Sequence, residues 1–220
     1  MTIKLLPKRI RKRYDVHEYK HACAILKEDF PDEWEDIIDV LDSFQLKKSD
    51  ISAGGGRKSK ISDKIDEFLY KKGWQEKSFR TEIVIDGITH ETPTHKIDCL
   101  KNRIALEIEW NNKDPFFDRD LNNFRLLHQL DAISVGVIIT RSTELQGIFK
   151  SMGKNIADKY GSSTTHMNKL LPRIEGGGAG GCPVLVFGIT EELFIDDNSL
   201  SGDSEELKEL LFISSDDDEE

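Results

Sequence analysis

The sequence predicts a mixed α/β fold in which a small central sheet is flanked by helices. Strand-like segments occupy the middle of the chain, with helical-period patterns on both sides of them. The apolar run at 133–140 is typical of a strand buried on both faces, and 183–189 reads as a last buried strand. At 220 residues, 37% of them hydrophobic, the chain is long enough for one compact core and short for two full domains.

The N-terminal third has helical patterns. Residues 17–28 read as one helix, and a proline opens a second at 32–44 whose apolar side chains recur with helical period. After the glycine-rich stretch at 54–60, Ser62 is suited to cap a third helix that runs to about Lys72.

Three strands are expected in the middle of the chain, at 79–86, 95–100 and 103–110. The short turns between them favour an antiparallel meander. We expect the last two strands to pair as a hairpin through Lys101 and Asn102.

A β-α-β unit follows. A helical pattern at 115–131 lies between the strand at 103–110 and the buried run at 133–140. Two further helical stretches, at 143–160 and 166–174, precede the last strand.

The net charge of −10 is unevenly distributed. Residues 190–220 carry 13 acids and one base, which leaves the preceding segment at a balance of +2. We therefore expect a basic N-terminal arm at 1–13, a folded domain at 14–190 and an acidic C-terminal tail at 191–220 that is partly disordered. Bases cluster in the arm and again at 57–64, and each cluster is either a source of positive potential or an ordinary solvated segment.

Nothing in the sequence indicates a membrane or an oxidising compartment. No run approaches the roughly 18 apolar residues that span a bilayer. Cys23, Cys99 and Cys182 are odd in number and far apart, without the close pairs of a disulfide or zinc framework. We expect a soluble protein of the reducing cytoplasm.

Three acids can meet on one side of the predicted hairpin. Glu107 and Glu109 are two residues apart on a strand and point to one face, and Asp98 belongs to the preceding strand. Crowded acids repel one another, so they either face open water or bind a cation. Carboxylates suit Mg²⁺, which lowers the pKa of a bound water for attack on phosphorus. An exposed strand face that happens to carry acids explains the same spacing, and the residues alone leave both interpretations open.

The order Asp98, Glu107 and Glu109 resembles the core of PD-(D/E)XK nucleases, with Glu109 where most members have lysine. Some restriction enzymes of that superfamily carry glutamate or glutamine there, so the departure leaves the role of the third residue open. The resemblance extends to the BglII/BstYI group of type II restriction enzymes over residues 14–190. The segments that carry it, in order, are YKHACAIL, PDEWEDIIDVL, KKGWQE, IDCLKNRIALEIEW, NNKDPF, SVGVIIT and PVLVFGI.

The resemblance implies a Mg²⁺-dependent endonuclease with a restriction-endonuclease-like core. It implies that Asp98 and Glu107 bind the metal, assisted by the main-chain carbonyl of Ile108. It further implies that Glu109 orients or activates the attacking water. Glu76 is a candidate further acid near the metal, with a solvated loop residue as an equal alternative.

Side chains suited to DNA flank the acids. Asn111 and Asn112 follow the acidic strand, and a side-chain amide can both donate to and accept from adenine in the major groove. The resemblance also places recognition here, and a plain Asn-Asn turn is the alternative. Lys60, Ser62 and Lys64 lie at a helix start, where free amides and the helix dipole favour a DNA phosphate. The glycine-rich stretch lacks the GK[ST] of phosphate-binding loops, so no nucleotide is expected.

One motif favours another class of protein. HEYKH, at 17–21, matches the HExxH pattern in which two histidines one helical turn apart bind zinc in proteases. Lys20 stands where those proteases have an uncharged residue, and no GxxH follows to supply a third ligand. A zinc protease is therefore not expected.

Together these features predict a type II restriction endonuclease that acts as a symmetric homodimer on a palindromic site of double-stranded DNA. By the resemblance, that site is centred on GATC. The alternatives are a repair or structure-selective nuclease with the same core, and a DNA-binding module without cleavage.

Overall fold

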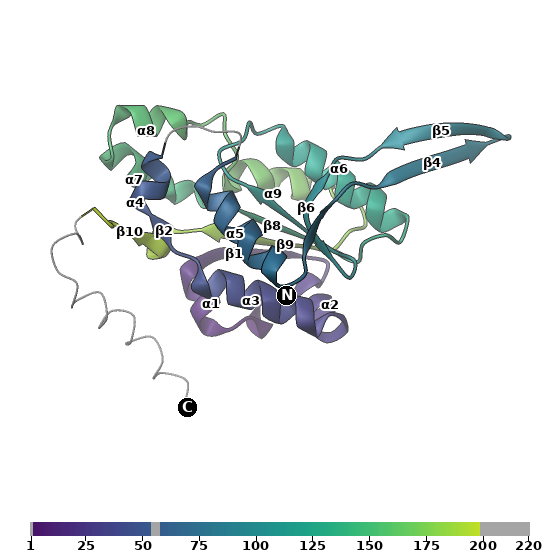
Figure 1. Ribbon diagram of the computed structural model, residues 1–220, viewed down its shortest axis with the longest axis horizontal. Helices are drawn as coiled ribbons and strands as arrows, with labels where there is room; N and C mark the ends of the chain where they lie inside the picture. The colour runs from purple at the N-terminus through teal and green to yellow at the C-terminus, as the bar shows by residue number, and fades with distance from the viewer. Residues whose placement is uncertain (1, 54–57, 199–220) are drawn as a thin grey trace.

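A six-stranded mixed sheet forms the centre of the protein (Figure 1). The computed structural model describes residues 2–53 and 58–198. In spatial order the strands are β1 (Tyr14–Tyr19), β9 (Val184–Ile189), β8 (Val135–Arg141), β7 (Ile104–Glu109), β6 (Ile97–Lys101) and β3 (Gln75–Lys77). Strands β7, β8 and β9 run parallel, and the other neighbouring pairs are antiparallel. The predicted mixed α/β class is confirmed.

Helices cover both faces of the sheet. The described helices are α1 (Lys8–Arg13), α2 (Ala22–Asp29), α3 (Pro31–Ser43), α4 (Lys48–Ser52), α5 (Lys60–Lys71), α6 (Phe116–Gln129), α7 (Gln146–Ser151), α8 (Lys154–Lys159) and α9 (Met167–Glu175), with short 3₁₀ turns η1 (Ile3–Leu5), η2 (Thr143–Leu145) and η3 (Glu191–Leu193). One apolar cluster joins the sheet to α2, α3 and α5, and a second joins it to α6 and α9. In β8, Val137 belongs to the first cluster and Ile138 to the second, so this strand is buried on both faces, as predicted.

The predicted β-α-β unit consists of β7, α6 and β8, with the two strands paired in parallel. Helix α6 buries Phe117, Leu121 and Phe124 against the sheet. Gly136 of β8 permits this close approach, because a Cβ there would lie 2.4 Å from the Phe124 ring. The unit places the first turn of α6 beside the end of β7.

The hairpin of β6 and β7 is confirmed, with its turn one residue later than expected. Lys101 pairs with Ile104, and the two residues between them, Asn102 and Arg103, have φ values of 44° and 75°. Positive φ at both central residues is the geometry of a type I′ turn, whose twist matches that of the strands. This turn sets the register that brings the acids of the two strands together.

The helix expected at 17–28 is wrong in its first part. Residues up to Tyr19 form β1, which pairs along its whole length with β9, and helix α2 begins only at Ala22. Pairing with a buried strand satisfies the backbone of this segment from a distant part of the chain. His17 therefore lies in a strand and His21 has a left-handed φ of 60°, so the two are not one helical turn apart and the zinc-protease geometry is absent.

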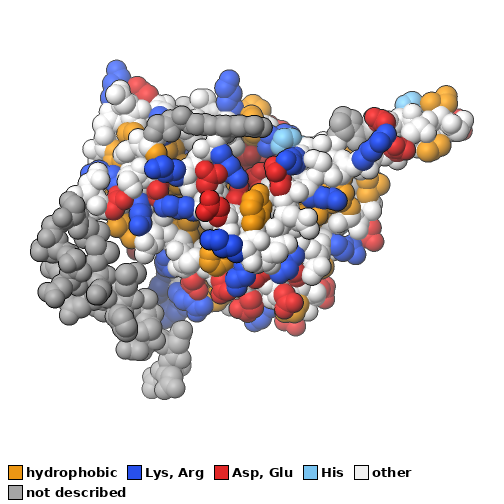
Figure 2. All heavy atoms as spheres, viewed as in Figure 1, with side chains coloured by type: hydrophobic (Ala, Val, Ile, Leu, Met, Phe, Trp, Pro, Cys, Tyr) orange, Lys and Arg blue, Asp and Glu red, His pale blue; other side chains and the backbone are white. Residues whose placement is uncertain are grey.

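The three-stranded meander is also wrong. Strand β4 (Arg80–Ile85) does not join the central sheet but pairs with β5 (Ile88–Pro93), which the sequence analysis missed. The two strands turn at Asp86 and Gly87, both with positive φ, and Asp-Gly is a strong hairpin dipeptide that could have indicated the turn. The hairpin projects from the body (Figure 1), and apolar side chains are exposed at its tip (Figure 2).

Two helix boundaries differ from expectation. Helix α5 is capped by Ser59, whose hydroxyl accepts a hydrogen bond from the Ser62 amide at 3.0 Å, so Ser62 is the donor and not the cap. The stretch at 143–160 is divided into η2, α7 and α8, and Gly153, with a φ of 109°, separates the last two.

The terminal segments are packed where they are described. The basic residues 8–13, expected as part of an arm, form α1, which buries Ile10 and pairs Arg9 with Asp42 of α3. Residues 194–195 form β10 (Phe194–Ile195), parallel to β2 (Leu46–Lys47). Most of the predicted acidic tail, 199–220, and the glycine-rich residues 54–57 lie outside the described residues.

All three cysteines are buried and free. Within residues 2–53 and 58–198, no helix has the length and apolar character needed to cross a membrane. Acidic and basic side chains are interspersed over the face shown in Figure 2, in keeping with a nearly neutral body.

Candidate active site

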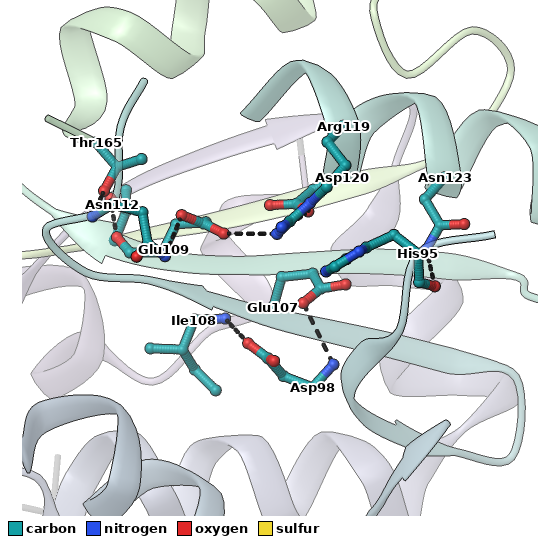
Figure 3. Close-up of polar contacts among 11 residues, drawn as sticks. His95, Asp98, Glu107, Ile108, Glu109, Asn112, Arg119, Asp120, Asn123 and Thr165 are labelled. Carbon is teal, nitrogen blue, oxygen red and sulfur yellow. Dashed lines mark hydrogen bonds and ion pairs between the residues drawn. The ribbon is translucent and has the colours of Figure 1, made fainter. Parts of the chain in front are cut away.

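The acids Asp98 and Glu107 lie where β6 and β7 separate. The paired residues closest to this end are Cys99 and Leu106. Beyond them, side chains replace the backbone pairing: the Asp98 amide donates to Glu107 Oε2 at 3.3 Å, and the Ile108 amide donates to Asp98 Oδ2 at 3.2 Å (Figure 3). The two carboxylates are therefore held side by side, as the hairpin register predicted.

Glu109 is held by two donors from outside the hairpin. The Asn112 side chain donates to Glu109 Oε2 at 2.8 Å, and Arg119 donates to Oε1 at 3.2 Å (Figure 3). Arg119 also binds Asp120 Oδ1 at 2.8 Å. Helix α6 thus brings one base and one further acid to the acidic strand.

Burial separates these acids from an ordinary strand surface. Only 1% of Glu107 and 2% of Glu109 are exposed, and Asp120 is fully buried. This result excludes the interpretation of an exposed strand face that happens to carry acids.

The pKa values of all three buried acids are raised. Burial, followed by the charge of Asp120 and a hydrogen bond with it, raises the pKa of Glu109 to about 9. Burial, followed by the charges of Asp120 and Asp98, raises the pKa of Glu107 well above its ordinary value. Burial likewise raises the pKa of Asp120. The cluster therefore favours bound protons or a bound cation over three free negative charges.

Two buried oxygens in this cluster, Glu107 Oε1 and Asp120 Oδ2, have no hydrogen-bond partner. Unpartnered buried carboxylate oxygens fit a divalent cation, which would satisfy them and offset the crowded charge. No three His, Cys, Asp or Glu side chains in the described part of the chain converge to enclose a metal by themselves. Mg²⁺ does not require such a cage, because it retains waters and commonly binds one or two carboxylates together with substrate phosphates.

A cleft of about 830 Å³ opens over the acids. Asp98 and Glu109 line the cleft, whereas the buried Glu107 is not among its lining residues. The lining residues that concern the site are Lys58, Lys60, Ser62, Glu76, His95, Lys96, Asp98, Ile108, Glu109, Asn111, Asn112 and Arg119.

A family model for the restriction endonucleases BglII and BglIII matches residues 14–189, which is most of the chain. The chain belongs to the BglII family of restriction endonucleases. Membership makes the protein a type II site-specific deoxyribonuclease, acting on double-stranded DNA, and confirms the resemblance seen in the sequence. Among curated proteins, no sequence matches the chain significantly.

This BglII-family enzyme brings four of the five predicted DNA-contacting residues to the cleft, namely Lys60, Ser62, Asn111 and Asn112. The fifth, Lys64, does not line the cleft but forms an ion pair with the buried carboxylate of Asp50. Asn111 has a left-handed φ of 61°, and its side-chain oxygen is buried without a partner.

Asn112 and Glu76 are both engaged in the structure. Asn112 binds Glu109 through its side chain, and its backbone amide and carbonyl pair with Thr165. Glu76 is exposed at the cleft and forms an ion pair with Lys96 at 2.5 Å.

Sequence reasoning missed Arg119, Asp120 and His95. Asp120 lies on the face of α6 that carries Phe117 and Leu121, and an acid on the buried face of an amphipathic helix is a signal that could have identified it. His95 lines the cleft near the acids, and burial, followed by the charge of Arg119, lowers its pKa.

Proposed function

We propose that this enzyme hydrolyses double-stranded DNA with Mg²⁺ bound by Asp98 and Glu107. The observation that carries the proposal is the pairing of these two carboxylates at the base of the cleft, with Glu107 Oε1 buried and unpartnered. A bound Mg²⁺ would supply a water of lowered pKa and offset charge on the phosphate.

The side chains around the metal position have distinct roles in this proposal. Asp98 and Glu107 hold the ion, with the main-chain carbonyl of Ile108 as a further oxygen ligand. Glu109 orients the attacking water, and Asn112 and Arg119 fix the direction of its carboxylate. Glu76, which lines the cleft, is the candidate for a further acid near the metal.

We further infer a homodimer acting on a palindrome centred on GATC. A two-fold symmetric protein presents the same cleft to each strand of a palindromic site, so each subunit cuts one strand. Asn111 and Asn112 are the residues proposed to read bases, and Lys60 and Ser62 at the start of α5 are proposed to bind phosphate.

Digestion of plasmid DNA with Mg²⁺ tests this function. Discrete fragments whose sequenced ends share a GATC core are expected, and chelation should abolish them. Nicks at junctions would instead indicate a structure-selective nuclease, and binding without cleavage would indicate a DNA-binding module. Light scattering of the protein alone and with a site duplex checks the dimer.

Asn112→Ala is expected to reduce sequence discrimination. A bidentate contact to a base contributes about 1–3 kcal/mol, so the ratio of specific to random DNA binding should fall by about 5- to 150-fold. The measurement is made in an Asp98→Asn background, because Asn112 also holds Glu109 and its loss would otherwise slow cleavage as well. An unchanged ratio would place recognition elsewhere.

Lys60→Ala is expected to weaken specific and random binding together. A phosphate contact positions DNA without choosing among sequences, and its loss should lower the slope of log K against log salt by about 1. Titrations at several salt concentrations measure the slope. Lys71→Ala is the matched control, because Lys71 is an exposed lysine of the same helix and does not line the cleft.

A further inference from the structure

Lys58 lies in the segment just before α5 and lines the same cleft as Asp98 and Glu109. Its ammonium forms an ion pair with Asp66, lies 3.7 Å from Asp63 Oδ1, and is 6.0 Å from the centroid of the Tyr70 ring. The side chain is 42% exposed, so part of it remains accessible from the cleft.

Asp66 anchors this lysine from within the protein. It projects from α5, is only 1% exposed, and accepts a hydrogen bond from Cys99 Sγ at 3.3 Å. One turn later, the Tyr70 hydroxyl donates to the main-chain carbonyl of Asp98 at 3.1 Å. Helix α5 is therefore attached to β6 at Asp98, and Asp66 of the same helix fixes the position of Lys58 relative to Asp98.

The other charged groups of the cleft indicate what Lys58 can do there. The third residue of the acidic motif is Glu109, so this position supplies no positive charge to a phosphate. Arg119 is engaged by Glu109 and Asp120, and the ammonium of Lys159 by the carbonyls of Ile51 and Ala53.

Unlike Arg119 and Lys159, Lys58 has one close ion pair, with the buried carboxylate of Asp66, and its second acid, Asp63, lies 3.7 Å away. Its ammonium has three donors, so one remains for a phosphate oxygen. Partial burial lowers its pKa, but the hydrogen bond and charge of Asp66, followed by the charge of Asp98, raise the pKa overall. Lys58 is thus a fixed and charged donor at the cleft.

We propose that the Lys58 ammonium contacts a non-bridging oxygen of the phosphate that is cleaved, and that Asp66 is the positioning residue that holds it there. The proposal rests on the proposed function of the cleft. Lys58 stays protonated throughout: it offsets charge that develops on phosphate oxygen while water attacks phosphorus and the P–O ester bond breaks.

The test is single-turnover cleavage of a site duplex, with enzyme in excess and above its Kd. Lys58→Met is expected to lower the rate about 100-fold or more, as for loss of one preorganised donor, and Lys58→Arg should recover at least about tenfold of that loss. Binding of the same duplex, measured in the Asp98→Asn background, should change by less than about tenfold. Lys71→Met is the matched control, because Lys71 is an exposed lysine at the end of α5 that does not line the cleft, and this variant should match wild type.

A double-mutant cycle separates positioning from a structural role of Asp66. Asp66→Asn alone should slow cleavage, whereas the Lys58→Met/Asp66→Asn double variant should be no slower than Lys58→Met, because Asp66 acts through Lys58. The double variant also removes the buried acid that Lys58→Met would leave unpaired, which guards against misfolding.

A Lys58→Met rate within about threefold of wild type, or no recovery in Lys58→Arg, overturns the inference, as does additivity in the cycle. These outcomes leave the proposed function standing, provided that wild type cuts and Asp98→Asn does not. Failure of wild type to cut overturns the function and the inference together.

Discussion

Asp98→Asn and Glu107→Gln are expected to remove cleavage while DNA binding survives. Each change keeps the shape of the side chain and an oxygen that can accept the amide hydrogen bond seen at Glu107 Oε2 or Asp98 Oδ2. What is lost is a charged ligand for Mg²⁺. A metal that contributes about 4 kcal/mol to transition-state stabilisation corresponds to a loss of about 10³-fold in rate.

Single-turnover rates with saturating enzyme measure this loss, and binding of a site duplex without metal measures what is retained. Asp118→Asn is the matched control: Asp118 is an exposed acid of α6 that pairs with Arg173 and does not line the cleft. Near wild-type cleavage by either site variant would show that the metal is bound elsewhere.

Glu109→Gln is expected to stabilise the metal-free protein at high pH. The pKa of Glu109 is raised from 4.5 to about 9 by burial and by Asp120. Between these values the folded state retains a proton that the unfolded state releases, so the free energy of unfolding of wild type falls as pH rises through this window. The glutamine variant has no such proton to lose.

The melting temperature of Glu109→Gln in chelator should therefore exceed that of wild type by more at about pH 8 than at about pH 5. A gain of about 2 kcal/mol corresponds to about 4–8 °C for a chain of this size. Glu35→Gln, at an exposed position of α3, serves as the control and should show no pH-dependent difference. An equal effect of Glu109→Gln on the melting temperature at both pH values would contradict the raised pKa of Glu109.

The features that could be predicted from the sequence are local ones. Strand periodicity places Glu107 and Glu109 on one face, and a two-residue turn fixes the strand register, so the meeting of Asp98 with Glu107 needs no information from distant residues. The apolar runs that form the buried strands β8 and β9 can likewise be recognised from the sequence alone.

The errors arose where distant segments compete for the same backbone. Residues 17–19 were expected to begin a helix, yet they pair with β9, which lies about 170 residues later in the chain. Strand β4 was expected in the sheet, but β3 occupies the edge next to β6 and leaves β4 to pair with β5.

The sequence by itself determined the family and the α/β class, and it predicted the acids of the candidate site. Only the tertiary structure decided that Glu107 and Glu109 are buried, because their exposure depends on α6 closing over β7 and bringing Arg119 and Asp120 with it. The same holds for Lys58, which Asp66 of α5 holds at the cleft. These contacts join residues that are distant in sequence, and no local periodicity encodes which helix face will meet which strand end.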